Sequence, residues 1–155
     1  MKKIMFVCHG NICRSPMAEF IMKSIVREAG KEDNYFIVSA ATHTDEICSG
    51  RGSPIYPPAR EQLVKHSIPF GDKHATLLKC SDYNDYDLFV GMDDENIRSI
   101  NRIFGGDPAY KIHKLLSFSG DDDNVSDPWY TRDFDRAFSD IYRGCAALFK
   151  VTDSE

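Results

Sequence analysis

The chain has 155 residues, of which 42% are hydrophobic and 28% are charged; this is the size and balance of one globular domain and excludes a disordered, collagen-like or coiled-coil protein. Its formal net charge of −5 supplies no overall positive field for nucleic acid or an anionic membrane, so we expect neither as a partner. No apolar run approaches the roughly 20 residues that span a bilayer, the N-terminal apolar run is too short for a signal peptide, and the five cysteines are irregularly spaced, which predicts a cytoplasmic protein with reduced thiols.

Short apolar segments alternate along the chain with segments of helical periodicity. The apolar segments end at turn residues such as Gly10 and Asn11, and they predict strands over residues 3–8, 35–40, 87–92 and 112–118. The periodic segments begin at capping residues or prolines. They predict helices over about 15–29, 57–66, 93–104 and 134–148.

This alternation predicts the fold class. Strands that alternate with helices form a parallel sheet with helices on both faces, so we expect an α/β protein: a single three-layer αβα domain over residues 1–155, doubly wound around a four-stranded parallel sheet. Such sheets bind ligands beyond the carboxyl ends of their strands, where loops lead into helix N-termini. The loops of interest are therefore 9–15, 41–53 and 119–130.

A thiol and a guanidinium flank the first of these loops, since Cys8 ends the first strand and Arg14 lies at the start of the first helix. Backbone N–H groups in a tight loop converge on one anion, the helix N-terminus adds positive charge, and Arg14 can bind two phosphate oxygens. The same field stabilises a thiolate, which makes Cys8 a candidate nucleophile towards phosphorus. The residues expected to bind phosphate are His9, Gly10, Asn11, Ile12, Cys13, Arg14 and Ser15.

The loop also allows two less reactive interpretations. Cys8 could be a buried structural thiol with Arg14 in solvent, since short motifs also arise by chance. Cys8, His9 and Cys13 could form a zinc site, but the sequence lacks the two paired Cys/His clusters of structural zinc sites and Arg14 would repel the cation. We therefore expect no metal.

Residues 7–19, Val-Cys-His-Gly-Asn-Ile-Cys-Arg-Ser-Pro-Met-Ala-Glu, resemble the N-terminal signature of the low-molecular-weight protein tyrosine phosphatases nearly residue for residue. Further similar segments follow in the family's order over the whole chain: Ser39-Ala40-Ala41-Thr42, His74-Ala75, Met92-Asp93-Asp94-Glu95-Asn96 and Val125-Ser126-Asp127-Pro128-Trp129-Tyr130. The resemblance implies a phosphomonoester hydrolase that needs no cofactor. It would act on phosphotyrosine proteins or small aryl phosphates through a cysteinyl-phosphate and release inorganic phosphate.

The resemblance also implies roles for residues outside the loop. It assigns the general acid and base to Asp127, in an Asp-Pro dipeptide. Judged from its position alone, Asp127 could serve as this acid or could be a helix cap or turn residue. The resemblance further joins Asn11 to Ser15, Ser39 and His74 in a hydrogen-bond network. The last two could instead be ordinary polar residues near a strand edge.

Apolar side chains near the acid predict the leaving group. Trp129 and Tyr130 directly follow the Asp-Pro dipeptide and Ile12 lies in the loop, so we expect these three to flank a phenyl ring, which favours phosphotyrosine. Asp45 aligns with a position that usually carries an aromatic residue in the family, and the stretch Cys48–Arg51 is additional. An acidic rim disfavours acidic phosphopeptides, so we do not copy the substrate preference of relatives.

Two side chains offer regulation. Cys13 lies five residues from Cys8, close enough for a reversible disulfide that would protect or switch off the nucleophile, although it could also be a packed thiol. Phosphorylation of Tyr130 is implied by the resemblance alone. We expect a monomer or a weak dimer.

Three alternative functions remain compatible with the loop. An arsenate reductase needs a relay of further cysteines, and after Cys80 no cysteine follows until Cys145. A phosphoarginine phosphatase resembles the same family but tends to carry Thr where Ile12 stands. A non-catalytic phosphate-binding module would need neither the thiol of Cys8 nor the carboxyl of Asp127. The residues therefore favour a tyrosine phosphatase.

Overall fold

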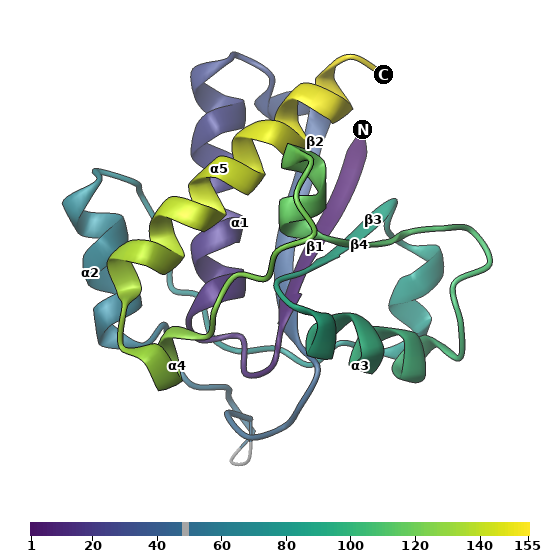
Figure 1. The fold of residues 1–155 in the computed structure, drawn as a ribbon, viewed down its shortest axis with the longest axis horizontal. Coiled ribbons are helices and arrows are strands. Elements are labelled where there is room, and N and C mark those ends of the chain that lie inside the picture. Colours follow the sequence, from purple (N-terminus) through teal and green to yellow (C-terminus); the bar gives the residue numbers. More distant parts are fainter. Residues whose placement is uncertain (48–49) are drawn as a thin grey trace.

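A computed structural model describes residues 1–47 and 50–155 (Figure 1). Its parallel sheet has the strand order β2-β1-β3-β4, and the predicted α/β fold class is confirmed. The strands are β1 (Lys2–Cys8), β2 (Tyr35–Ala41), β3 (Leu88–Gly91) and β4 (Ile112–Lys114). The α-helices are α1 (Arg14–Glu28), α2 (Pro57–Lys65), α3 (Asp94–Phe104), α4 (Pro128–Thr131) and α5 (Phe134–Asp153), and the 3₁₀ turns are η1 (Glu32–Asn34), η2 (Cys80–Asn84) and η3 (Leu115–Ser119).

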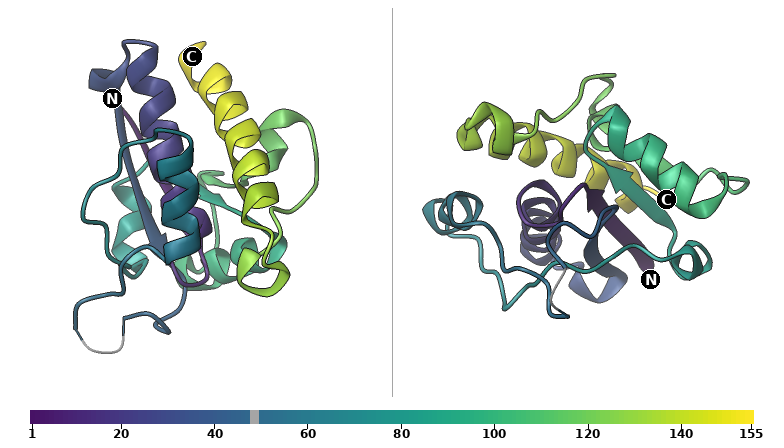
Figure 2. Two further views of the ribbon diagram at one scale, coloured as in Figure 1. Left: turned by 90° about the vertical axis from the view of Figure 1, so that its left-hand side faces the viewer. Right: turned by 90° about the horizontal axis from the view of Figure 1, so that it is seen from below.

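The alternation of side chains along β1 explains why helices cover both faces of the sheet. Ile4, Phe6 and Cys8 point to the face covered by α1, α2 and α5. Met5 and Val7 point to the opposite face, which α3 and η2 cover (Figure 2). All five side chains are buried, because β1 is an inner strand with a helical layer on each side. The central strand therefore ends at Cys8 in a buried position.

The register of the sheet gathers the functional loops at one edge. Cys8 lies beside Ala41 of β2, and Val7 lies beside Gly91 of β3, so three parallel strands end together at the lower edge of the sheet in Figure 1. The loop between η3 and α4 reaches the same edge, where the N–H of Val125 donates to the carbonyl of Met92 at 2.9 Å. The site therefore lies where a doubly wound sheet places its ligands.

The fourth strand is shorter than the predicted 112–118. β4 ends at Lys114, and the chain continues as η3, in which Leu115 and Leu116 are both buried under α5. Both leucines pack into the same core cluster, on the side of the sheet that α5 covers, whereas successive side chains of a strand point to opposite faces; a tight turn fits this arrangement. Gly144 makes room for this turn, since a Cβ there would lie 2.5 Å from the Cγ of Leu115. An apolar run alone cannot separate these two conformations.

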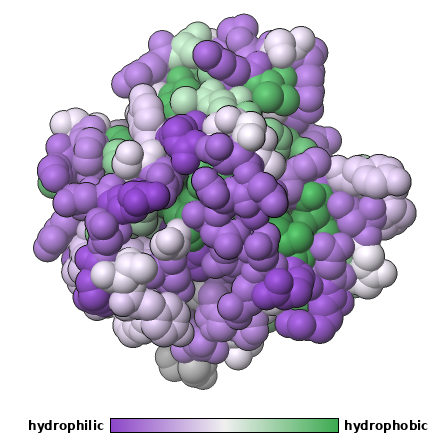
Figure 3. Space-filling view, viewed as in Figure 1, coloured by the Kyte–Doolittle hydropathy of each residue, from purple (hydrophilic) through white to green (hydrophobic). Residues whose placement is uncertain are grey.

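The outer surface shows no wide apolar area on the face seen in Figure 3, which is mostly hydrophilic with small hydrophobic patches. Within residues 1–47 and 50–155, no helix combines the length and the apolar character needed to cross a bilayer. 

Candidate active site

The loop between β1 and α1 curls around a cavity of about 370 Å³. Cys8 and Arg14 stand at its two ends, and each is only 3% exposed. Asn11 has a φ of 59°, in the left-handed region that Asn tolerates better than most residues, and this conformation lets the loop turn tightly. Residues 8–14 all line the cavity. Ser15, predicted with them, is instead fully buried one residue into α1 and does not line it.

A hydrogen-bond network supports Cys8 from below. The Oγ of Ser15 lies 3.0 Å from the Sγ of Cys8, and the Nδ2 of Asn11 donates to that Oγ at 2.7 Å. Asn11 also donates to the Oγ of Ser39 at 3.0 Å, and Ser39 donates its own proton to Glu19 at 2.6 Å. As a thiol, Cys8 donates to this Oγ; when the sulfur is a thiolate, the hydroxyl of Ser15 can donate its proton to the sulfur instead. Asn11, Ser15 and Ser39 thus come together as predicted.

Lys73 and Glu19 are a pair of charged side chains that contact this network. The Nζ of Lys73 donates to the carbonyl of Ser39 at 2.9 Å and lies 3.9 Å from Oε1 of Glu19. Both side chains are largely buried, and burial lowers the pKa of Lys73, while Glu19 and Cys8 act in the opposite direction. The backbone N–H of Thr76 donates to Oδ1 of Asn11 at 3.0 Å and fixes the orientation of its amide.

His74 is not part of the network, so that prediction is wrong. Its Nδ1 lies 3.2 Å from Arg51 and 3.2 Å from the carbonyl of Asp72, on the outer side of the segment. The neighbouring Lys73 points inward instead, because successive side chains of an extended segment face opposite ways. The residues that hold Ser39 in the network are therefore a lysine and a carboxylate rather than a histidine.

Arg14 is held by groups from two other elements. Its Nη1 donates to Oδ2 of Asp93 at 2.7 Å and to the carbonyl of Val125 at 2.8 Å. Burial opposes the guanidinium charge, but Cys8, Asp93 and Asp127 outweigh it and raise the pKa of Arg14. The arginine is thus a fixed cation at the cavity wall, with its orientation set before any ligand binds.

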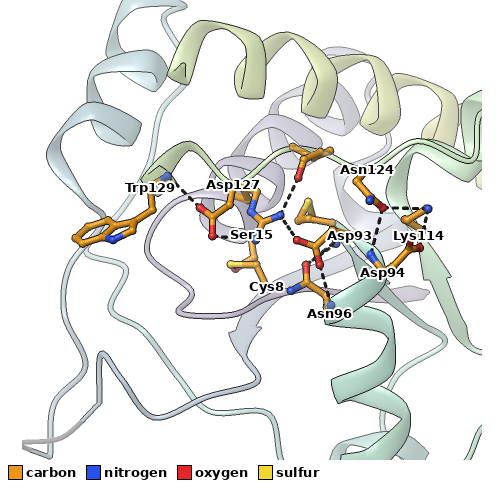
Figure 4. A network of polar contacts seen from close by, with 12 residues as sticks. Cys8, Ser15, Asp93, Asp94, Asn96, Lys114, Asn124, Asp127 and Trp129 are labelled. Carbon is orange, nitrogen blue, oxygen red and sulfur yellow. Dashed lines mark hydrogen bonds and ion pairs between the residues drawn. The ribbon is translucent and has the colours of Figure 1, made fainter. Parts of the chain in front are cut away.

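Asp127 caps a helix and also faces the cavity. Its Oδ1 accepts the N–H of Trp129 at 3.0 Å and caps the short helix α4, while its Oδ2 lies 3.4 Å from Nη2 of Arg14 (Figure 4). The carboxylate lines the same cavity as Cys8. A thiol, a guanidinium and a carboxyl group therefore converge on a space large enough for a phosphate ester.

Comparison with known proteins gives this arrangement a family. A family model described as "Low molecular weight phosphotyrosine protein phosphatase" matches residues 3–155. The chain belongs to this family. YfkJ of Bacillus subtilis, a low molecular weight protein-tyrosine-phosphatase, is 34% identical over 157 aligned positions, and the alignment covers 100% of this chain and 98% of YfkJ. PtpA of Staphylococcus aureus (strain MRSA252) is 35% identical over 152 aligned positions, and the alignment covers 96% of this chain and 92% of that relative.

Solved structures of the low molecular weight phosphatases share the fold. The crystal structure of YfkJ superimposes with a TM-score of 0.93 at 33% identity and covers 99% of this chain and 96% of its own. SP-PTP from Streptococcus pyogenes superimposes with a TM-score of 0.85 at 36% identity and covers 97% and 92%. The resemblance predicted from residues 7–19 and the later segments is confirmed.

One wall of this phosphatase's cavity is aromatic. Ile12, Trp129 and Tyr130 line the cavity, as predicted, and Trp129 and Tyr130 keep 46% and 81% of their surface exposed. Tyr56 packs against Trp129 with ring centroids 4.9 Å apart, and the guanidinium of Arg132 lies over both rings. These contacts fix Trp129 from behind and leave its outer surface to a ligand.

The rim formed by the loop after β2 is polar. Oδ2 of Asp45 lies 2.8 Å from Nε2 of His9. His9 in turn stacks on His43 with centroids 4.0 Å apart and an angle of 8° between the rings. The hydrogen bond from His9 lowers the pKa of Asp45. A flat imidazole held by a carboxylate therefore lies at this rim, next to Glu46.

The remaining cysteines differ in their surroundings. Burial, with the nearby charges of Cys8 and Asp127, raises the pKa of Cys13 to about 12. Cys80 is exposed on η2 and does not line the cavity, and Cys145 is fully buried. Of the additional stretch Cys48–Arg51, residues 48 and 49 lie outside the described residues.

Sequence reasoning missed Asp93, Lys73 and Glu19 as parts of the site. Asp93 was expected only as the cap of a helix, which it is, but the same carboxylate also holds Arg14. Glu19 belonged to the recognised signature, but its contact with Ser39 bridges 20 residues, and no local pattern reveals it. In the part of the chain that the structure describes, no three His, Cys, Asp or Glu side chains are grouped to hold a metal ion.

Proposed function

We propose that this chain hydrolyses phosphotyrosine in proteins and small aryl phosphates, with Cys8 as nucleophile, Arg14 as phosphate ligand and Asp127 as general acid and base. The observation that carries the proposal is that Cys8, Arg14 and Asp127 line one cavity, with the Asp127 carboxylate 3.4 Å from the guanidinium. Family membership supports the same activity. Phosphate binding alone would require neither the thiol nor the carboxyl group.

In the first step the thiolate of Cys8 attacks phosphorus in line with the leaving oxygen. The bond from phosphorus to the phenolic oxygen breaks as the sulfur–phosphorus bond forms, and Asp127 delivers its proton to the departing oxygen. Phosphate oxygens replace the Asp127 carboxylate on Arg14, which frees that carboxyl group to face the leaving oxygen. The products are a cysteinyl-phosphate and a neutral phenol.

In the second step the Asp127 carboxylate takes a proton from a water molecule that attacks the cysteinyl-phosphate. The sulfur–phosphorus bond breaks, the electron pair returns to sulfur, and inorganic phosphate is released. The hydroxyl of Ser15, 3.0 Å from the sulfur, donates to the emerging thiolate and eases its departure. Asp127 ends protonated and is ready for the next substrate.

Arg14 and the loop N–H groups stabilise the charge on the equatorial oxygens in both transition states. Because Arg14 is held by Asp93 and Val125 before substrate binds, little reorganisation is needed at the moment of reaction. Preorganised donors of this kind are worth on the order of 100- to 1000-fold in rate each.

The depth of the cavity favours a tyrosine ester. Cys8 is 3% exposed, whereas Trp129 and Tyr130, which line the same cavity, keep 46% and 81% of their surface exposed. A phenyl ring bridges this depth and contacts the aromatic wall, whereas the short side chain of phosphoserine leaves phosphorus out of reach of the sulfur.

Cys13 gives the site a redox response. Hydrogen peroxide oxidises the Cys8 thiolate to a sulfenic acid, and hydroxide is released. The Cys13 thiol then attacks the sulfur of the sulfenic acid, so that a disulfide forms and water is released. A dithiol restores both thiols. Because the pKa of Cys13 is raised to about 12, this attack is slower than that of an exposed thiol. With Cys13→Ser, inactivation by peroxide should no longer be reversed by dithiothreitol.

The proposal includes a single-domain enzyme over residues 1–155 that acts in the cytoplasm as a monomer or weak dimer. The free thiols of Cys8, Cys13, Cys80 and Cys145 support a reducing compartment. Light scattering at several protein concentrations tests the oligomeric state.

The decisive experiment measures hydrolysis of p-nitrophenyl phosphate and of peptides carrying phosphotyrosine, phosphoserine or phosphoarginine, with a chelator present. We expect the wild type to hydrolyse p-nitrophenyl phosphate and the phosphotyrosine peptide. Cys8→Ser should hydrolyse neither and should still bind phosphate. Equal turnover by Cys8→Ser would contradict the proposal. Preferred cleavage of phosphoarginine, or thiol oxidation that depends on arsenate, would point to the corresponding alternative enzyme.

A further inference from the structure

Lys114 carries a buried ammonium group between two parts of the active site. It ends β4, and its side chain is 7% exposed. Its Nζ donates to Oδ1 of Asp94 at 2.8 Å, to the carbonyl of Asp122 at 2.7 Å and to Oδ1 of Asn124 at 3.0 Å. Asp94 is the first residue of α3, whereas Asp122 and Asn124 belong to the loop that leads to Asp127 (Figure 4). One cation therefore joins this loop to α3.

Two further contacts continue this connection towards the cavity. The backbone N–H of Asp94 donates to Oδ1 of Asn124 at 3.2 Å, on the same oxygen that Lys114 contacts. The next residue, Val125, is fully buried, and its carbonyl accepts the Nη1 of Arg14. Asn124, which Lys114 contacts, thus directly precedes the residue that holds Arg14 and lies three residues before Asp127.

The charge of Lys114 is suited to hold an acidic loop. Residues 121–123 are three consecutive aspartates, which would repel one another and favour an extended, solvated loop. Burial disfavours the ammonium group, but the hydrogen bond and charge of Asp94 and of Asp122 outweigh burial and raise the pKa of Lys114. The hydrogen bond from Lys114 also lowers the pKa of Asp94. Lys114 therefore stays charged at neutral pH.

We propose that Lys114 is a positioning residue for the general acid: it holds residues 122–125 against α3 and so places the Asp127 carboxyl group beside Arg14 and above Cys8. Lys114 touches neither the substrate nor the reacting atoms. This inference rests on the proposed function, since it assumes that Asp127 donates a proton to the leaving oxygen.

The test uses Lys114→Met, which keeps the length and apolar stem of the side chain and removes the charge. A displaced acid matters most when the leaving group needs a proton, and kcat/KM reports only the first step, in which that proton is given. The kcat/KM for phenyl phosphate should therefore fall roughly tenfold or more, while that for 2,4-dinitrophenyl phosphate falls less than about threefold. Lys114→Arg should restore part of the difference.

Arg143→Met is the matched control. Arg143 forms an ion pair with Asp121 and contacts Ser119, so it binds the same loop, but farther from Asp127. It is also more exposed than Lys114. In this variant the ratio of the kcat/KM values for the two substrates should be that of the wild type. An equal change in Arg143→Met and Lys114→Met would show that any loosening of the loop has this effect, and would overturn the proposal.

A double-mutant cycle separates positioning from a merely structural role. In an Asp127→Ala background no acid remains to be positioned, so adding Lys114→Met should cause no further loss of kcat/KM for phenyl phosphate. The same fold-loss in both backgrounds would overturn the proposal. If Lys114→Met does not fold, Asn124→Ala, which removes one partner and leaves the others, takes its place with the same predictions.

The result also distinguishes this inference from the proposed function. If Asp127→Ala shows the dependence on the leaving group and Lys114→Met does not, only the role of Lys114 is wrong. If Asp127→Ala lowers kcat/KM equally for both substrates, Asp127 is not the acid and the two proposals fail together.

Discussion

The Nη1 of Arg14 lies 2.7 Å from Oδ2 of Asp93, so the residue that caps α3 also orients the guanidinium that α1 brings to the cavity. Oδ1 of the same carboxylate accepts the backbone N–H of Asn96 at 2.8 Å. One side chain therefore joins a helix terminus to the guanidinium of a residue 79 positions away in the chain.

Replacement of Asp93 should impair both stability and phosphate binding. Asp93→Ala removes a helix cap, worth about 1 kcal/mol, and one of the groups that hold Arg14, so we expect KM for p-nitrophenyl phosphate to rise roughly tenfold. Asp133→Ala is the control, because Asp133 caps α5 through the N–H of Arg136 and does not contact Arg14. It should lower the melting temperature similarly without changing KM. A similar KM in both variants would show that the Arg14 contact is dispensable.

Removal of the Ser15 hydroxyl should slow the second step more than the first. Ser15→Ala takes away the donor to the Cys8 thiolate, and a hydrogen bond to a charged group is worth about 1.5–3 kcal/mol, or roughly 10- to 100-fold in rate. Rapid mixing with p-nitrophenyl phosphate should show a burst of nitrophenol close to one equivalent, followed by slow turnover. A smaller kcat without a burst would mean that Ser15 assists attack rather than departure.

The two lysines that contact Glu19 should differ in importance. Lys73 also donates to the carbonyl of Ser39. Lys23 donates to Oε2 of Glu19 at 2.7 Å, and its own side chain is 38% exposed. Lys73→Met should weaken the inhibition by inorganic phosphate several-fold, because it loosens the network under Asn11. Lys23→Met, a partly exposed pair within one helix, should change it less than twofold. Equal effects of the two variants would contradict this role of Lys73.

Buried thiols should make the protein less stable in alkali. Burial raises the pKa of Cys145 in the folded chain, so the unfolded chain loses this proton at a lower pH, and the free energy of unfolding is highest below about pH 8.5 and falls above it. Between pH 7 and pH 10 the wild type should lose about 2 kcal/mol more than Cys145→Ala, as measured by urea unfolding. Cys80→Ala, at an exposed position, is the control. Parallel curves for wild type and Cys145→Ala would refute the expectation.

The parts of the site that could be predicted from the sequence are contiguous in the chain. Residues 8–15 carry the thiol, the turn and the guanidinium within one loop, and the alternation of strands and helices places that loop at a sheet edge. Asp127 was found because the segment 125–130 resembles the family. In each case short-range order decides the outcome.

The parts that were missed depend on which way a side chain points. Lys73 and His74 are neighbours, and a sequence alone does not show which of them faces inward, so the histidine was chosen on resemblance and the lysine was overlooked. Asp93 and Lys114 stand at the ends of elements, where charged residues are usually exposed; here each is held by partners from distant segments. Long-range contacts of this kind carry no local pattern.

Acid trapping of the covalent intermediate tests the central claim most directly. Asp127→Ala retains Cys8 and Arg14 but lacks the base for the second step, so incubation with p-nitrophenyl phosphate followed by rapid acid quenching should leave phosphate on the protein. Peptide mass spectrometry should find that phosphate on the sulfur of Cys8 at close to one equivalent, and none in Cys8→Ser. Phosphate on another residue, or release of nitrophenol without any phosphorylated protein, would contradict the account.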